Sequence, residues 1–167
     1  MGFWGGDTVI QENTSDYLYQ CVSNHVGQKD YEESFIFSSV RNPYSRAVSM
    51  FAHWSWDEVK TFKEFCDALK KDQFPGYKAA SKWHSSTLTE HLVAGNDLKV
   101  DFVIKFEALQ EGFDVVCDTL EMPRQTLPHA NRSNHKHYTE YYTNETRRIV
   151  AEKYAKDIEY FGYEFGG

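Results

Sequence analysis

The chain has 167 residues, 41% of them hydrophobic and 26% charged, and carries a formal net charge of −7. This length predicts a single domain, residues 1–167, whose core buries roughly two-thirds of the unfolded surface, and the composition excludes a disordered chain. The negative charge argues against a nucleic-acid partner. The absence of an apolar run near the ~20 residues that cross a bilayer, and of a signal-peptide pattern, predicts a cytoplasmic protein.

The amino-terminal residues contain one predicted helix and little else. Residues 1–13 are expected to be flexible or to form an irregular edge segment. Thr14 can cap a helix over residues 14–26, whose apolar side chains share one side, and Gly27 can end it.

The clearest pattern in the chain is a strand followed directly by a helix. Residues 35–40 are aromatic and β-branched without a charge, which predicts a strand covered on both faces. Asn42 is a good N-cap, and Pro43 suits the first helical position, where no N–H is needed. Arg41 is therefore expected at the carboxyl end of a strand, beside a helix N-terminus that favours an anion.

Two serines are predicted to lie on the same side of this helix as Arg41. Ser49 follows Arg41 by roughly two turns, and Ser45 lies between them. Arginine offers a planar fork of donors and serine one more, a combination suited to a phosphate group.

The rest of the chain predicts further helices and one more strand. The predicted helices start at Thr61 with a capping box, span 81–93 and 109–120, and run from Thr143 through Tyr154; the strand spans 101–106. Two strands separated by helices imply a right-handed parallel α/β arrangement. The aromatic ending, with Tyr160, Phe161, Tyr163 and Phe165, is expected to close the core.

One stretch departs from the acidic character of the chain. Between Met122 and Thr139 there is no acidic residue, whereas Arg124, Arg132 and Lys136 occur with three histidines. A local basic loop is what a small anionic ligand would select, and a solvated surface loop is the alternative.

These segments resemble the sulfotransferases that use 3′-phosphoadenosine 5′-phosphosulfate (PAPS), particularly the carbohydrate sulfotransferase branch. Val40 to Ser49, V-R-N-P-Y-S-R-A-V-S, is similar to the segment of that family that binds the 3′-phosphate of the donor. Residues 101–109, with an F-E-x-L turn, 127–133 and 157–165 resemble later family segments in the same order.

The resemblance implies a fold and a set of donor contacts. The fold would be a truncated form of the three-layer, P-loop-NTPase-like α/β fold, with a small parallel sheet and mostly helical surroundings. Arg41 and Ser49 would hold the 3′-phosphate of PAPS, and Arg132 and Lys136 would make further donor contacts. The implied reaction passes a sulfuryl group from PAPS to an acceptor hydroxyl, which in the carbohydrate branch belongs to a sugar, with no metal.

The chain departs from the family pattern at its amino-terminal end. The family has a strand and a Gly-rich loop whose lysine neutralises charge on the departing oxygen, but the first lysine here is Lys29 and only Gly5-Gly6-Asp7-Thr8 faintly matches that loop. The sequence is thus either a shortened version of a longer protein or a relative that has lost this site. Glu12 and His25 are the candidates for the catalytic base. The alternative for Glu12 is a carboxylate in the first helical turn that complements the helix dipole, and for His25 a residue at the helix end without a catalytic role.

Three functional hypotheses follow from the sequence. The first is the sulfotransferase, and the second is a non-catalytic nucleotide or anion binder that keeps the 3′-phosphate site. The third, a metal hydrolase using His129, His135 and His137, is disfavoured because that loop offers no carboxylate or cysteine. Cys21, Cys66 and Cys117 are expected to be buried free thiols. Self-association is also expected to be possible, because the small sheet would leave a strand edge open and 16% of all residues are aromatic.

Overall fold

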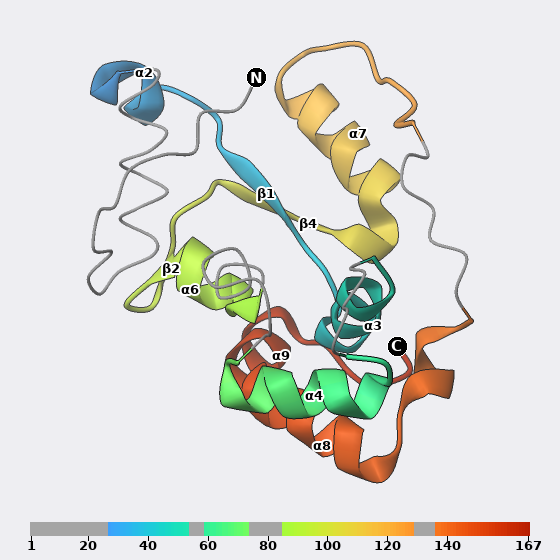
Figure 1. The fold of residues 1–167 in the computed structure, drawn as a ribbon. Helices are drawn as coiled ribbons and strands as arrows, with labels where there is room; N and C mark the ends of the chain where they lie inside the picture. The colour runs from blue at the N-terminus through green and yellow to red at the C-terminus, as the bar shows by residue number, and fades with distance from the viewer. Residues whose placement is uncertain (1–26, 54–58, 74–84, 129–135) are drawn as a thin grey trace.

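The structure, a computed structural model, describes residues 27–53, 59–73, 85–128 and 136–167. It has an α/β fold with a small parallel sheet and mostly helical surroundings (Figure 1). In chain order the elements are α2 (Gln28–Glu32), β1 (Phe37–Val40), α3 (Pro43–His53), α4 (Phe62–Lys71), α6 (Leu88–Leu92), β2 (Val93–Ala94), β3 (Asp97–Leu98), β4 (Phe102–Lys105), η1 (Phe106–Ala108), α7 (Leu109–Thr119), η2 (Tyr138–Tyr141), α8 (Asn144–Lys153) and α9 (Ala155–Phe161). Among these described helices, none is long and apolar enough to span a membrane.

The two predicted strands pair with each other. β1 and β4 run parallel, in a register that extends from Phe37 opposite Phe102 to Val40 opposite Lys105. The expectation that the first strand is covered on both faces is wrong. Val40 is buried, but Phe37 is 41% exposed, because only the carboxyl end of this short strand reaches the core.

The predicted helix starts are confirmed at three places where a side chain caps free amides. The Asn42 side-chain oxygen accepts the N–H of Tyr44, 3.0 Å away, at the start of α3. Thr61 forms a capping box with the third residue of α4, and Thr143 does the same at α8. The local chemistry of single residues therefore sets where these helices begin.

Two predicted helices differ from the structure in extent. Within the expected helix over 81–93, α6 begins only after Thr87, whose hydroxyl caps it, and Val93 belongs to a small antiparallel hairpin formed by β2 and β3. The expected last helix is broken at Tyr154 into α8 and α9. The break allows α8 to pack on α4 while α9 packs on α6.

The main hydrophobic core lies between α3, α4, η2 and α8, at the end of the molecule away from α2 (Figure 1). A smaller cluster around Val40, Leu92 and Tyr163 supports the sheet. Cys66 and Cys117 are buried free thiols, as predicted, and burial raises the pKa of Cys66 to about 12. Cys21 lies outside the described residues.

Helix α7 packs closely on strand β4 because it has a glycine at the contact. A Cβ atom at Gly112 would lie 2.4 Å from Cγ2 and 3.2 Å from Cβ of Ile104. Ile104 is only 3% exposed, and these atoms are attached near its backbone, so they cannot move aside alone.

We therefore expect Gly112→Ala to lower the free energy of unfolding by about 1–3 kcal/mol. The better helix propensity of alanine offsets at most about 1 kcal/mol of this loss. Chemical denaturation measures the effect. In an Ile104→Ala background the same substitution should be neutral or stabilising, and an equal loss in both backgrounds would show that the contact does not cause it.

Candidate functional site

The junction between β1 and α3 positions Arg41. The strand ends at buried Val40, and the buried Asn42 caps the helix and turns the chain. Arg41 lies between these two anchored residues, at the carboxyl end of a parallel strand and beside the first turn of α3. This is the location that the sequence predicts, at a helix end whose dipole favours an anion.

Arg41 is partly buried and is held on two sides. Its Nε donates to the Ser45 hydroxyl, 3.1 Å away, and its guanidinium carbon lies 4.5 Å from the centre of the Phe106 ring. Burial lowers the pKa of Arg41, Glu107 opposes this shift, and the neighbouring Arg46 adds to it. No described carboxylate lies within 4.0 Å of its nitrogens, so the charge of Arg41 has no direct ion-pair partner among the described residues.

Ser49 extends the same side of α3. It is partly buried and follows Ser45 by four residues, which places the two hydroxyls one above the other on the helix. Ser45 is thus bonded to Arg41 at the start of α3, and Ser49 lies one turn further along the same side of the helix. Together they offer guanidinium and hydroxyl donors to a single anion.

The end of β4 holds the same turn from the opposite side. One carboxylate oxygen of Glu107 accepts the backbone N–H of Asn42 at 2.7 Å, and the other accepts the Tyr163 hydroxyl at 3.2 Å. Burial and the adjacent Glu107 carboxylate raise the pKa of Tyr163. Glu107 belongs to the F-E-x-L turn that resembles the family, but no role for it was predicted from the sequence.

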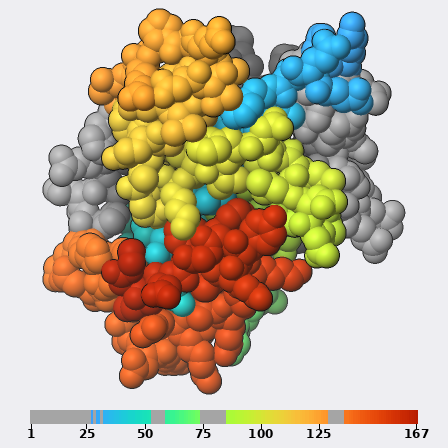
Figure 2. Space-filling view, turned by 180° about the vertical axis from the view of Figure 1, so that it is seen from behind, coloured from blue at the N-terminus to red at the C-terminus, as the bar shows by residue number. Residues whose placement is uncertain are grey.

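The carboxyl-terminal residues Glu164 and Phe165 contact the turn between β1 and α3. The Asn42 side-chain amide donates to the Glu164 carbonyl at 2.9 Å, and the Phe165 ring packs edge-on against Tyr44 at 5.1 Å. Figure 2 shows this segment in red, lying between the sheet region and α8 and leaving little of α3 visible. The predicted core role is confirmed for Tyr163, which is 7% exposed, but not for Tyr160, which is 44% exposed on α9.

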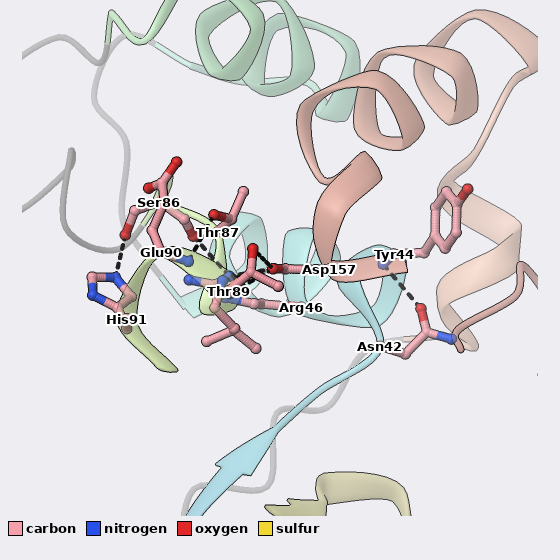
Figure 3. A network of polar contacts seen from close by, with 10 residues as sticks. Asn42, Tyr44, Arg46, Ser86, Thr87, Thr89, Glu90, His91 and Asp157 are labelled. Carbon is pink, nitrogen blue, oxygen red and sulfur yellow. Dashed lines mark hydrogen bonds and ion pairs between the residues drawn. The ribbon is translucent and has the colours of Figure 1, made fainter. Parts of the chain in front are cut away.

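A buried ion pair connects α3 to α6 and α9 (Figure 3). Arg46 Nη1 lies 3.9 Å from an oxygen of Asp157, which is completely buried, and donates to the Ser86 carbonyl at 3.0 Å. Asp157 also accepts the backbone N–H groups of Leu88 and Thr89, both at 2.8 Å, and the Thr89 hydroxyl at 2.9 Å. No sequence pattern indicated this network, because its members are far apart in the chain.

Of the remaining predicted site residues, the structure describes only Lys136, and it does not place Lys136 in this cluster. Lys136 is exposed just before η2, with its ammonium nitrogen 3.9 Å from a carboxylate oxygen of Glu140, and no described interaction connects it to Arg41. Glu12, His25 and Arg132 lie outside the described residues, as do His129 and His135 of the metal hypothesis. Within the described part of the chain, no group of three or more His, Cys, Asp or Glu side chains could hold a metal ion.

Comparison with known proteins identifies the family. The model of the sulfotransferase family matches residues 9–164, which is almost the whole chain. Comparisons with curated proteins and with solved structures gave no match. The extent of the family match, together with the α/β fold and the strand-to-helix turn at Arg41, leads to one conclusion: the chain belongs to the sulfotransferase family.

Proposed function

We propose that this protein is a sulfotransferase that uses PAPS as the donor and a carbohydrate hydroxyl as the acceptor. Membership of the family supports sulfuryl transfer in general, and the family generally uses PAPS. The single observation that carries the donor assignment is the partly buried Arg41, with its side chain anchored and its charge without a direct ion pair among described residues.

In this proposal the 3′-phosphate of PAPS binds at the start of α3. The terminal nitrogens of Arg41 and the Ser49 hydroxyl donate to phosphate oxygens, and the amino-terminal end of α3 adds a favourable dipole. Arg132 and Lys136 would contact the donor further out. A charged pair of this kind, formed in a partly desolvated place, contributes affinity and also fixes the orientation of the nucleotide.

The proposed reaction is an in-line displacement at sulfur. The bond between the sulfuryl sulfur and the bridging oxygen of the 5′-phosphate breaks as the acceptor oxygen bonds to sulfur, and the departing phosphate keeps the electron pair. The acceptor proton passes to a base, for which Glu12 and His25 are the candidates. As in phosphoryl transfer, positioning and charge stabilisation would supply most of the catalysis.

The test is transfer of labelled sulfate from PAPS to a panel of mono- and oligosaccharides by the full chain. We expect a labelled sugar to form, and its formation to be lost in Arg41→Ala. If no sugar is labelled but another class of hydroxyl compound is, the acceptor assignment is wrong. If no acceptor of any class is labelled, the enzyme assignment is wrong.

A non-catalytic nucleotide binder is the second candidate, and it is suggested by the residues given ahead of the 3′-phosphate segment. Residues 1–28 contain no lysine or arginine, whereas the family pattern places a loop lysine ahead of the 3′-phosphate segment. A protein of this kind would bind 3′-phosphoadenosine 5′-phosphate (PAP) through Arg41 and label no acceptor. Binding and transfer assays on the same preparation therefore separate the two candidates.

A further inference from the structure

We propose that Phe106 is a positioning residue for the anion site, because its ring holds the guanidinium of Arg41 in one orientation. The inference rests on the proposed function, since it explains how Arg41 is presented to a phosphate. It adds to that function a residue that does not itself contact the anion.

The register of the sheet places Phe106 beside Arg41. Val40 is the last residue of β1 and lies opposite Lys105, the last residue of β4. The pairing continues in side-chain contacts beyond the strands: Phe106 lies against Arg41, and Glu107 accepts the N–H of Asn42. Phe106 and Glu107 thus act on consecutive residues of the opposite turn. Glu107 restrains the backbone at Asn42, and Phe106 restrains the side chain of Arg41.

Phe106 lies at the surface, outside the hydrophobic core. Its ring is 45% exposed and belongs to neither of the two hydrophobic clusters of buried residues. Exposed apolar side chains are common, so the role of this ring follows from what it contacts and not from its exposure. The ring presents its face to the guanidinium, where the negative quadrupole of the ring attracts the cation.

The Arg41 side chain has two contacts that restrain it. The guanidinium of Arg41 lies over the Phe106 ring, and Ser45 accepts the proton of Nε. These two contacts leave both terminal nitrogens for a bidentate interaction, and they restrain a side chain that otherwise has many rotamers. Restraint before binding reduces the entropy that must be lost when the phosphate binds.

The first experiment compares two nucleotides that differ only in the 3′-phosphate. Calorimetry on the full chain gives the affinities for PAP and for adenosine 5′-phosphate, and their ratio isolates the contribution of the 3′-phosphate. We expect Phe106→Leu to reduce this ratio about tenfold, and Phe106→Tyr, which keeps the ring, to preserve it. An unchanged ratio in Phe106→Leu would overturn the inference.

The matched control is Tyr160→Leu, which removes an aromatic ring of almost equal exposure that makes no contact with Arg41. It should leave the ratio unchanged. A similar decrease in this control would show that the loss at Phe106 reflects general destabilisation and would also overturn the inference.

A second measurement does not depend on a nucleotide. The Nε–Hε signal of Arg41 in a ¹⁵N-correlated NMR spectrum is assigned by its absence in Arg41→Lys. Phe106→Leu should shift this proton downfield, through loss of the ring current, and speed its exchange with water, whereas Phe106→Tyr should not. If the intact chain binds neither nucleotide, the proposed function fails, and this signal alone decides whether Phe106 holds Arg41. An unchanged signal in Phe106→Leu would show that it does not.

Discussion

Replacing Asp157 by alanine is expected to lower the free energy of unfolding by about 3–5 kcal/mol, the range for breaking a buried ion pair by removing one partner. Asp157 is completely buried and faces Arg46. The substitution leaves the charge of Arg46 without its carboxylate, and it removes the acceptor of two backbone N–H groups and of the Thr89 hydroxyl. A single domain has about 5–15 kcal/mol of stability, so this loss is a large fraction of the total.

Chemical denaturation of the variant measures this loss. The matched control is Asp118→Ala, because Asp118 also binds an arginine, Arg124, through two short hydrogen bonds but does so in solvent. Exposed pairs contribute little, so this variant should stay close to the parent. Equal losses in the two variants would mean that burial does not set the strength of the Asp157 network.

The second large effect is expected for Arg41→Ala in nucleotide binding. Removing one partner of a desolvated charge pair should weaken binding of PAP by about 2–5 kcal/mol, whereas the stability of the fold should change little. The reason is that, within the described part of the chain, the Arg41 side chain makes one hydrogen bond and one ring contact, and its charge has no direct ion pair there.

Two variants separate the role of the guanidinium from that of general charge. Arg148→Ala removes an exposed arginine of α8 that pairs only with Glu152 among described carboxylates, and it should leave the affinity nearly unchanged. Arg41→Lys keeps the charge but loses the planar fork, and it should recover only part of the binding. Full recovery by lysine would show that charge alone matters at this position.

The sequence predicts those parts of the structure that depend on neighbouring residues. The caps at Asn42, Thr61 and Thr143 are local, because a side chain bonds to an amide two or three residues away, and all three are confirmed. The position of Arg41 is predictable for the same reason. A strand, a cap and a proline in succession determine where the residue between them must lie.

Where helix prediction fails, competing local chemistry explains the error. The predicted helix over 81–93 runs through the polar residues 85–87, but serine and threonine side chains can bond to backbone groups and so start a new helix there. The structure uses Thr87 in this way to begin α6. Apolar spacing also could not show that Phe37 is exposed, since exposure depends on which elements cover the strand.

The contacts that complete the candidate site could not be predicted from the sequence. Phe106 reaches Arg41, and Glu107 reaches Asn42, through the register of two strands that are distant in the chain. Asp157 meets Arg46 only because the break at Tyr154 places α9 beside α6. These interactions follow from tertiary packing, and a single sequence contains no periodic signal for them.

The most direct test of the donor site is calorimetric titration of the full chain with PAP, carried out in parallel on Arg41→Ala. We expect one-to-one binding by the intact protein, and binding by the variant that is at least about thirtyfold weaker, which corresponds to the lower end of the expected 2–5 kcal/mol. Absence of binding by the folded, intact protein, or equal binding by both proteins, would contradict the assignment of the 3′-phosphate site to Arg41.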